Sequence, residues 1–247
     1  MNVNAINMLP KVFLLLQDEY PKMNPHHETW ELWIKRDKTP KEFYEVVIGT
    51  ILVQNTNWRN VNRALSELEK KRLFSFHSIV NTDQRLLEES IRFAGFYKQK
   101  SEYIINLSRF IISQGIKTPS RESLLKIKGI GKETADSILE FCYGHPTPIV
   151  GTYTRRFLAR MLGEADFLNK KYEIVQKYIR NEFSQDFKDF GKLHALIVVH
   201  SQNICQKIAP KCNFCVLKAE CVYFINKEQS NLIANVQEQI MKRKKLN

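Results

Sequence analysis

Glycine is scarce in this sequence, with 9 in 247 residues, and no stretch alternates apolar and polar residues for long enough to predict a strand. The 8 prolines lie between segments whose apolar residues recur with a helical period. This composition excludes a collagen-like repeat, and no internal repeat is found. The sequence therefore predicts an all-α protein.

Long apolar runs are also missing, because a membrane-spanning helix needs roughly 20 such residues. The longest candidates, residues 46–53 and 195–199, are only long enough for a protein core. Residues 12–16 form an apolar run near the N-terminus, but Gln17, Asp18 and Glu19 follow at once, unlike a secretory signal. We therefore expect an intracellular protein with no membrane partner.

Acidic residues are in deficit, with 26 Asp and Glu against 38 Lys and Arg, which gives a formal charge of +12. The hydrophobic content of 43% is that of a globular protein and excludes a disordered chain. Each Lys or Arg that neutralises a phosphate releases a counterion, so the charge favours a nucleic-acid partner. Solubility alone is the alternative.

Cysteine is almost confined to one cluster. Cys142 lies apart and is predicted to be a small core residue, whereas Cys205, Cys212, Cys215 and Cys221 follow the spacing C-x6-C-x2-C-x5-C. In a reducing compartment this spacing indicates a metal site more than disulfides. Zinc sites usually combine two short pairs, so four thiolates on an iron–sulfur cluster fit the unequal loops better. Four cysteines scattered in a core are the remaining alternative.

Capping signals and periodicity predict the helices. Thr39-Pro40-Lys41-Glu42 combines an N-cap, an initial proline and a capping-box glutamate, so a helix should begin there and continue through Leu52. Further helices are predicted over residues 59–71, 84–93, 98–114, 121–127, 132–143, 152–162, 170–184 and 189–203. The segment from Lys227, which ends in the basic run 242–245, is predicted to be a solvated helix.

A glycine-rich turn joins two short helical segments within residues 124–136. Gly129 and Gly131 flank Ile130, which predicts a tight turn with left-handed backbone angles at the glycines and Ile130 anchored in the core. Backbone N–H groups of such a turn can bind a phosphate without regard to base sequence. Any helix-turn-helix junction could give this motif by itself.

With the hairpin and the cysteine cluster, three further segments resemble the endonuclease III superfamily of helix-hairpin-helix DNA glycosylases. They are Gln54-Asn55-Thr56-Asn57-Trp58 within residues 51–64, Gly95-Phe96-Tyr97, and residues 150–156. The resemblance covers about residues 40–225. It implies a two-lobed, all-α helix-hairpin-helix glycosylase fold with a C-terminal [4Fe-4S] cluster loop. Residues 36–146 would form a six-helix barrel domain, residues 1–35 with 147–225 the iron–sulfur domain, and residues 226–247 a basic tail.

The resemblance also implies a partner, double-stranded DNA that contains a damaged base, which a monomer in the bacterial cytoplasm or nucleoid would flip out of the stack. The implied DNA-binding residues are Gln54 and Asn55, Phe96, the hairpin residues Gly129, Ile130, Gly131, Lys132 and Thr134, and the loop lysines Lys207 and Lys211. Asn55, with Gln54, and Phe96 would fill or wedge the vacated duplex. Asn55 as a local cap, Phe96 as core and plain surface lysines are the alternatives. The family's cluster, here on Cys205, Cys212, Cys215 and Cys221, is structural, and His200 is expected beside it.

One position separates the family's branches. Members that also cut the strand carry a lysine four residues after the first hairpin glycine, because an amine is needed for a Schiff base, and here that position is Glu133. This predicts a monofunctional glycosylase. Residues 131–138 and 54–58 most resemble the bacterial 3-methyladenine DNA glycosylases, so an alkylated, cationic purine is the expected substrate, held by aromatic rings. Trp30, Trp33, Phe43 and Tyr44 are candidates.

The family's catalytic aspartate position, eighteen residues beyond Glu133, is Gly151. An aspartate there would stabilise positive charge on the sugar and activate water, and glycine does neither. Three explanations stay open: an engineered variant, a natural protein that binds damage without cutting, or substitution by another acid, for which Glu133 is the candidate. A base-excision glycosylase is the leading function, and a bifunctional lyase on oxidised pyrimidines and a silent damage-binding protein are the alternatives.

Overall fold

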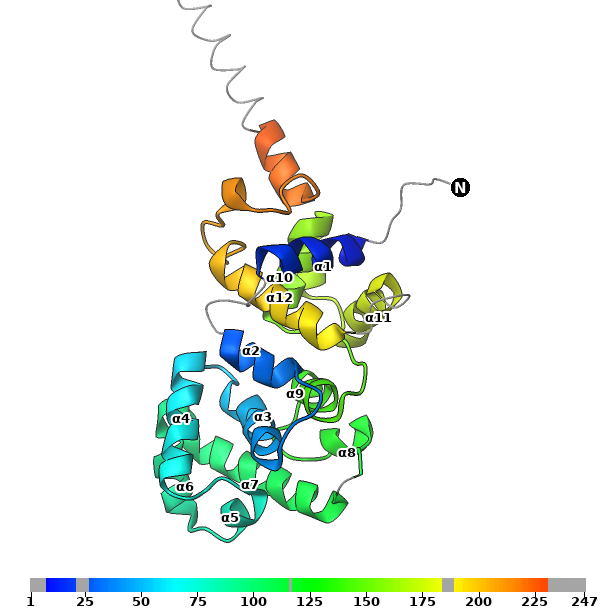
Figure 1. Ribbon diagram of the computed structural model, residues 1–247. Coiled ribbons are helices and arrows are strands. Elements are labelled where there is room, and N and C mark those ends of the chain that lie inside the picture. The colour runs from blue at the N-terminus through cyan, green and yellow to red at the C-terminus, as the bar shows by residue number, and fades with distance from the viewer. Residues whose placement is uncertain (1–7, 21–26, 116, 184–188, 231–247) are drawn as a thin grey trace, which may run out of the picture. The chain divides into compact units, whose positions relative to one another are not determined.

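The computed structural model describes residues 8–20, 27–115, 117–183 and 189–230, and within these ranges it contains helices and turns but no strand (Figure 1). The all-α prediction is therefore confirmed for the described chain. None of the described helices is both long and apolar enough to cross a membrane. The α-helices are α1 (Met8–Glu19), α2 (His27–Ile34), α3 (Pro40–Leu52), α4 (Trp58–Lys70), α5 (Phe76–Val80), α6 (Gln84–Ser90), α7 (Tyr97–Gln114), α8 (Arg121–Leu125), α9 (Lys132–Ser137), α10 (Thr152–Leu162), α11 (Tyr172–Phe183) and α12 (Phe190–Asn203).

Helix α3 begins at the predicted capping box. The Glu42 backbone N–H donates to Thr39 Oγ1 at 3.3 Å, and the Thr39 N–H donates to the Glu42 carboxylate at 2.7 Å. Two predicted helices are interrupted: residues 84–93 form α6 and a 3-10 turn, η1 (Arg92–Ala94), and residues 132–143 form α9 and a π-helical segment, η2 (Ile138–Cys142). Residues 222–230 are helical, whereas the basic run 242–245 lies outside the described residues.

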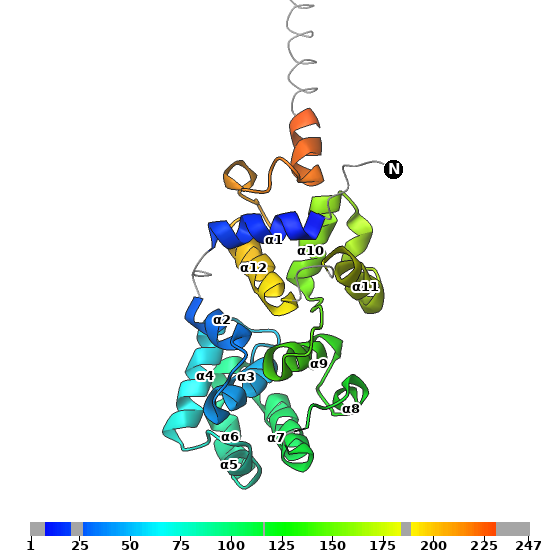
Figure 2. The same cartoon turned by 45° about the vertical axis from the view of Figure 1, so that its right-hand side comes forward.

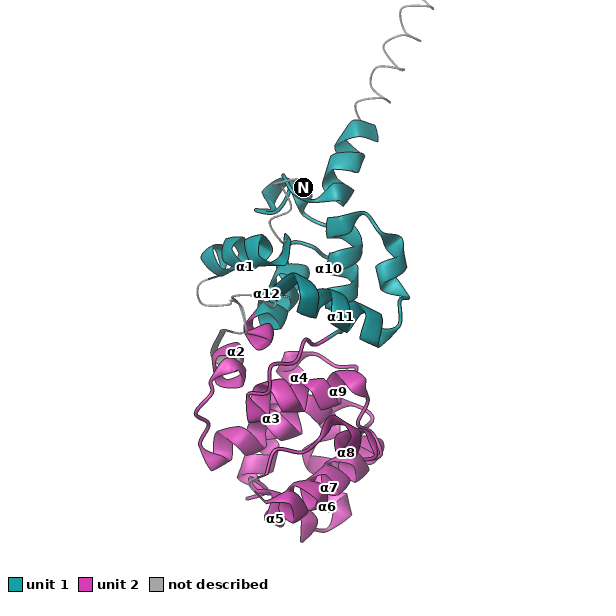
Figure 3. Cartoon of the chain, turned by 90° about the vertical axis from the view of Figure 1, so that its right-hand side faces the viewer, with its two compact units in different colours: residues 1–23, 150–187, 193–247 teal, residues 24–149, 188–192 magenta. Residues whose placement is uncertain are grey.

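The chain divides into two compact units (Figure 3). Unit 1 consists of residues 1–23, 150–187 and 193–247, and unit 2 of residues 24–149 and 188–192. Both units are therefore built from segments far apart in the sequence. The predicted division into a barrel domain, an iron–sulfur domain and a basic tail, with boundaries at residues 35, 146 and 225, assigns a role to each part. It stays a prediction.

Unit 2 is organised around α3, most of whose side chains are buried. The Trp33 ring meets Trp58 and Phe141 edge-on, with centroids 5.1 and 5.2 Å apart. Gly49 makes room for this ring, because a Cβ at that position would lie 2.8 Å from it. Trp30, Trp33 and Tyr44 are only 3%, 5% and 3% exposed, so these side chains are buried, and their role in holding a base stays a prediction.

Unit 1 groups α1, α10, α11 and α12 (Figure 2). Helix α1 packs on α11, where the rings of Phe13 and Phe183 lie 5.3 Å apart. Leu9 and Leu16 of α1 are fully buried, and Phe157 of α10 is 1% exposed. This core holds the start of α10 and the cysteine loop that follows α12.

Candidate nucleic-acid interface and cysteine cluster

The hairpin between α8 and α9 closes as a tight turn. Gly129 has φ +90°, and a Cβ there would lie 2.1 Å from the Tyr103 ring, so only glycine fits. Ile130 is 5% exposed and its N–H donates to Ile127 O at 3.0 Å, which confirms the anchor in the core. The left-handed prediction for Gly131 is wrong: it has φ −86° as the N-cap of α9, where a helix start requires extended backbone.

Gln54 connects the loop between α3 and α4 to this hairpin. Its side-chain Nε2 donates to Gly129 O and to Thr134 Oγ1, each at 3.2 Å. Thr134 is 9% exposed, whereas Lys132 is exposed. Gln54 and Thr134 therefore contact each other within unit 2, and their contacts with DNA stay a prediction.

Asn55 and Phe96 are exposed residues with left-handed backbones. Asn55 has φ 54° and Phe96 has φ 46°, and the Phe96 side chain is 63% exposed. This exposure rules out the alternative that Phe96 is core. The cap of α4 is Asn57, which accepts from the Asn60 N–H, so Asn55 is not the helix cap. A bulky residue with positive φ is a genuine outlier, and such strain clusters at functional sites.

Lys100 of α7 is a polar residue of this region that the sequence did not single out. It is 2% exposed, and its Nζ donates to Leu52 O and Ala94 O, each at 2.8 Å. Burial lowers the pKa of its ammonium group to about 8. The signal was present in the sequence: Lys100 falls on the apolar face of α7 with Ile104, Leu107 and Ile111.

The two predicted catalytic positions are at helix starts. Glu133 is an exposed residue in the first turn of α9 in unit 2. Gly151 is the buried N-cap of α10 in unit 1, with φ −94° and ψ −178°. These are angles that any residue adopts at a cap, so the backbone would accept an aspartate without strain.

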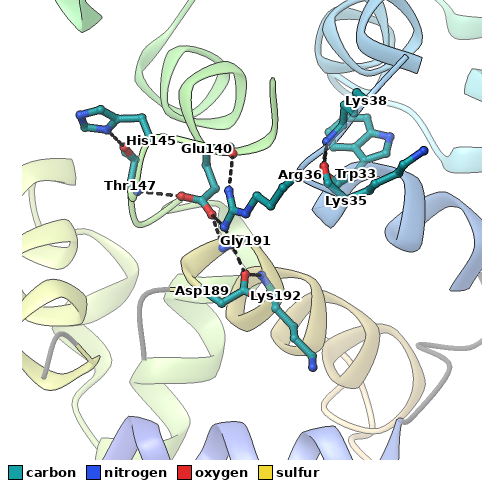
Figure 4. A network of polar contacts seen from close by, with 10 residues as sticks. All are labelled: Trp33, Lys35, Arg36, Lys38, Glu140, His145, Thr147, Asp189, Gly191 and Lys192. Atoms are coloured by element: carbon teal, nitrogen blue, oxygen red, sulfur yellow. Dashed lines mark hydrogen bonds and ion pairs between the residues drawn. The ribbon is translucent and has the colours of Figure 1, made fainter. Parts of the chain in front are cut away.

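A buried carboxylate organises the part of unit 2 drawn in Figure 4. The Glu140 side chain accepts from the N–H groups of Thr147 at 2.8 Å and Gly191 at 2.9 Å, and from Arg36 Nη2 at 3.1 Å. Burial raises the pKa of the Glu140 carboxyl group, and these donors oppose the rise. Three separate chain segments thus meet at one side chain that sequence reasoning missed.

The four clustered cysteines line one cavity in unit 1, together with His200 and Arg160. His200 lies beside them, with Nε2 3.5 Å from Cys215 Sγ and Nδ1 3.3 Å from the Tyr20 hydroxyl. In the described part of the chain, no three His, Cys, Asp or Glu side chains come together as a group that could hold a metal ion. The iron–sulfur loop predicted from the sequence is therefore not shown by the side-chain positions.

Two arginines of α10 donate hydrogen bonds to backbone carbonyls of the cysteine loop. Arg160 donates to Gln206 O at 2.7 Å and Lys207 O at 3.1 Å, and Arg156 donates to Cys205 O at 3.2 Å. Their spacing of four residues on α10 was the available signal. Lys207 and Lys211 are exposed, which fits both a phosphate contact and a plain surface lysine, so their contact with DNA stays a prediction. Lys207 lines an open cleft with residues 152 and 153 at the start of α10.

Comparison with known proteins places the chain in a family. Residues 48–185 match the family described as the HhH-GPD superfamily of base excision DNA repair proteins. A protein of Methanocaldococcus jannaschii described as a candidate DNA repair glycosylase is 34% identical over 90% of this chain and 99% of its own length. Endonuclease III of Sulfolobus acidocaldarius is 28% identical over 75% of this chain and 84% of its own.

Solved structures share the fold. A thermostable thymine-DNA glycosylase superposes with a TM-score of 0.70 at 21% identity, covering 90% of this chain and 100% of its own. The H. pylori 3-methyladenine DNA glycosylase bound to 1,N6-ethenoadenine gives 0.66 at 24% identity, covering 78% and 97%. The chain therefore belongs to the HhH-GPD superfamily of base excision DNA repair proteins. It is an endonuclease III superfamily DNA glycosylase.

Proposed function

We propose that the chain is a monofunctional DNA N-glycosylase that binds duplex DNA as a monomer, flips out a damaged base and removes it, with an alkylated purine as the substrate. The observation that carries the proposal is the pair Asn55 and Phe96, two exposed residues of unit 2 with left-handed backbones, of which Asn55 follows the hairpin-binding Gln54. Strained, exposed side chains of this kind suit the filling of a gap in a base stack.

The hairpin supplies binding that does not depend on base sequence. Backbone N–H groups of the turn around Gly129, with the exposed Lys132, would contact a phosphate. In unit 1, Lys207 and Lys211 of the cysteine loop would add phosphate contacts. The positive net charge of +12 supports such a polyanionic partner.

The residue at position 133 supports a monofunctional reaction. A lyase needs an amine nucleophile that forms a Schiff base with the sugar, and Glu133 has none. Lys132 directly precedes Glu133 on α9, and the side chains of consecutive helical residues project about 100° apart around the helix axis. Lys132 would therefore not replace a lysine at 133.

Because Gly151 has no carboxylate, another group must stabilise the positive charge that develops on the sugar as the base departs. We assign this role to the Glu133 carboxylate, which would stabilise the oxocarbenium-like sugar and accept a proton from the attacking water. An alkylated purine is already a good leaving group because it is cationic. The 3-methyladenine DNA glycosylase that shares the fold is consistent with this substrate class.

Four sulfurs around one cavity fit a [4Fe-4S] cluster on Cys205, Cys212, Cys215 and Cys221. A cubane holds its cysteines farther apart than a single ion does, so a cluster site and the lack of a single-ion site are compatible. When bound, the cluster would supply structural order and no redox chemistry on the base. The chain's own contribution is Arg156 and Arg160, which hold the loop carbonyls.

Base release from methylated duplex DNA tests the proposal. The wild type and Gly151→Asp should both release methylated purine, the variant faster, and Glu133→Gln in the wild-type background should abolish release. Borohydride should trap no covalent complex, and a trapped complex would instead show a bifunctional lyase. Release by neither the wild type nor Gly151→Asp would exclude the alkylated-base assignment.

A second candidate, a damage-binding protein that does not cut, is favoured by the absence of a carboxylate at Gly151. It predicts tight binding to methylated DNA without release by the wild type, and release only by Gly151→Asp. The cluster is tested separately by visible absorbance and iron content of the purified chain, both of which Cys212→Ser should reduce.

A further inference from the structure

One lysine side chain binds two backbone carbonyls that precede Asn55 and Phe96, two exposed residues of unit 2 with left-handed backbones. Leu52 ends α3 three residues before Asn55, and Ala94 ends η1 two residues before Phe96. Lys100 Nζ donates to both carbonyls at 2.8 Å. The ammonium group is therefore a bridge between the roots of two loops that are about 40 residues apart in the chain.

The chemistry of this position is unusual for a core lysine. Its side chain is 2% exposed, it lies on the apolar face of α7, and its ammonium group donates to two neutral carbonyls. Burying an ammonium group is costly unless it is well paired, and a methionine would fill the same volume without that cost. The presence of a buried ammonium group at this position indicates that the two loops require strong hydrogen bonds to one shared side chain.

We propose that Lys100 is a positioning residue that sets Asn55 and Phe96 in one fixed relation, so that both enter a damaged duplex together. The left-handed conformation is costly for a bulky residue such as Phe96 and persists there only where the surroundings impose it, whereas asparagine tolerates it more readily. The bonds from Lys100 impose it at both loop roots. The inference rests on the proposed DNA-binding function and deepens it, because it names the residue that makes recognition of damage a joint action of two loops.

The test uses Lys100→Met, and Lys98→Met as the matched control. Lys98 is on the same helix and exposed, so its loss removes equal charge without touching the loops. Binding is measured to a duplex with a tetrahydrofuran abasic-site analogue and to the same duplex undamaged. Neither probe requires base removal. A 2-aminopurine opposite the analogue reports insertion of side chains into the stack.

We expect Lys100→Met to lower the preference for the abasic duplex about tenfold, the order expected for one lost hydrogen bond to a charged group, and to abolish the 2-aminopurine change. Lys98→Met should leave the preference unchanged, and Lys100→Arg should recover part of it. In an Asn55→Ala and Phe96→Ala background, Lys100→Met should have no further effect on the preference, because the residues it positions are gone.

An unchanged preference in Lys100→Met, or an equal further loss in the double-alanine background, would overturn the inference and leave the proposed function intact. A wild type that does not prefer the abasic duplex would overturn the proposed function and this inference with it. If Lys100→Met does not fold, Lys100→Arg is carried through the same cycle. Its planar head group cannot reproduce both bonds, so it should then show the loss and the same non-additivity.

Discussion

The side-chain amide of Gln54 donates to the backbone carbonyl of Gly129 and to the hydroxyl of Thr134, each over 3.2 Å. The loop that carries Asn55 is thereby attached to the hairpin turn. Gln54→Leu should lower the free energy of unfolding by about 1–2 kcal/mol, because one carbonyl and one hydroxyl lose a partner in a partly buried site.

Urea unfolding measures this effect, and Thr134→Val is the matched variant. If the amide links the two elements, the two substitutions should couple by about 0.5 kcal/mol or more in a double-mutant cycle. Strict additivity would show that the two side chains do not cooperate.

Phe96→Gly should stabilise the protein and impair its recognition of damage. The left-handed backbone at φ 46° costs phenylalanine roughly 1–2 kcal/mol that glycine does not bear, and a ring that is 63% exposed loses little burial. We expect a gain of about 1 kcal/mol in thermal or urea unfolding, with the preference for abasic duplex lost.

Phe93→Gly is the control for that variant. Phe93 lies in η1 with its ring 3.8 Å from the Arg63 guanidinium, and it does not have a positive φ. This substitution should reduce stability. A loss of stability in Phe96→Gly as well would mean that the ring contributes more than the strain costs.

Glu140→Gln should destabilise the protein strongly. The amide nitrogen would face a backbone N–H of Thr147 or Gly191, and Arg36 would lose this charged partner and keep Asp189 at 3.7 Å. Breaking such a buried arrangement costs about 3 kcal/mol. Glu102→Gln, which removes an exposed pair with Lys128, should change the unfolding free energy by less than about 1 kcal/mol. Equal effects would contradict the assignment.

Stability should depend on alkaline pH through Lys100. The folded pKa is about 8 against an ordinary value of 10.5, so between these values the unfolded chain binds more protons. The contribution of this group to stability therefore rises with pH across that window. Between about pH 8 and about pH 10, the unfolding free energy of the wild type should rise by about 1–2 kcal/mol relative to that of Lys100→Met, as measured by urea unfolding. A constant difference would show that the lysine does not titrate there.

Features carried by local sequence signals were predictable. The capping box at Thr39 gave the start of α3, and the hairpin motif gave the buried Ile130. Contacts between distant segments were not predictable, because no local pattern encodes them. Lys100 resembles an ordinary surface lysine unless its position on the apolar face of α7 is considered. Glu140 resembles any other acidic residue on a helix, because the groups that it binds are distant in the sequence.

Composition was also ambiguous where residue type suited two environments. Tryptophans and tyrosines suit both a base pocket and a core, and the burial of Trp30, Trp33 and Tyr44 is compatible with either environment. Gly131 was expected to be left-handed because glycine permits it, but helix initiation requires an extended residue there. The ability of glycine to adopt a conformation is weaker evidence for that conformation than a local structure that requires it.

The ring of Tyr103 occupies the space that any side chain at position 129 would fill. Replacing that ring by a small side chain would free the space but not relieve the positive φ of +90°, so a larger residue in the turn would still be strained. Position 129 should consequently stay glycine among relatives, whichever residue occupies position 103.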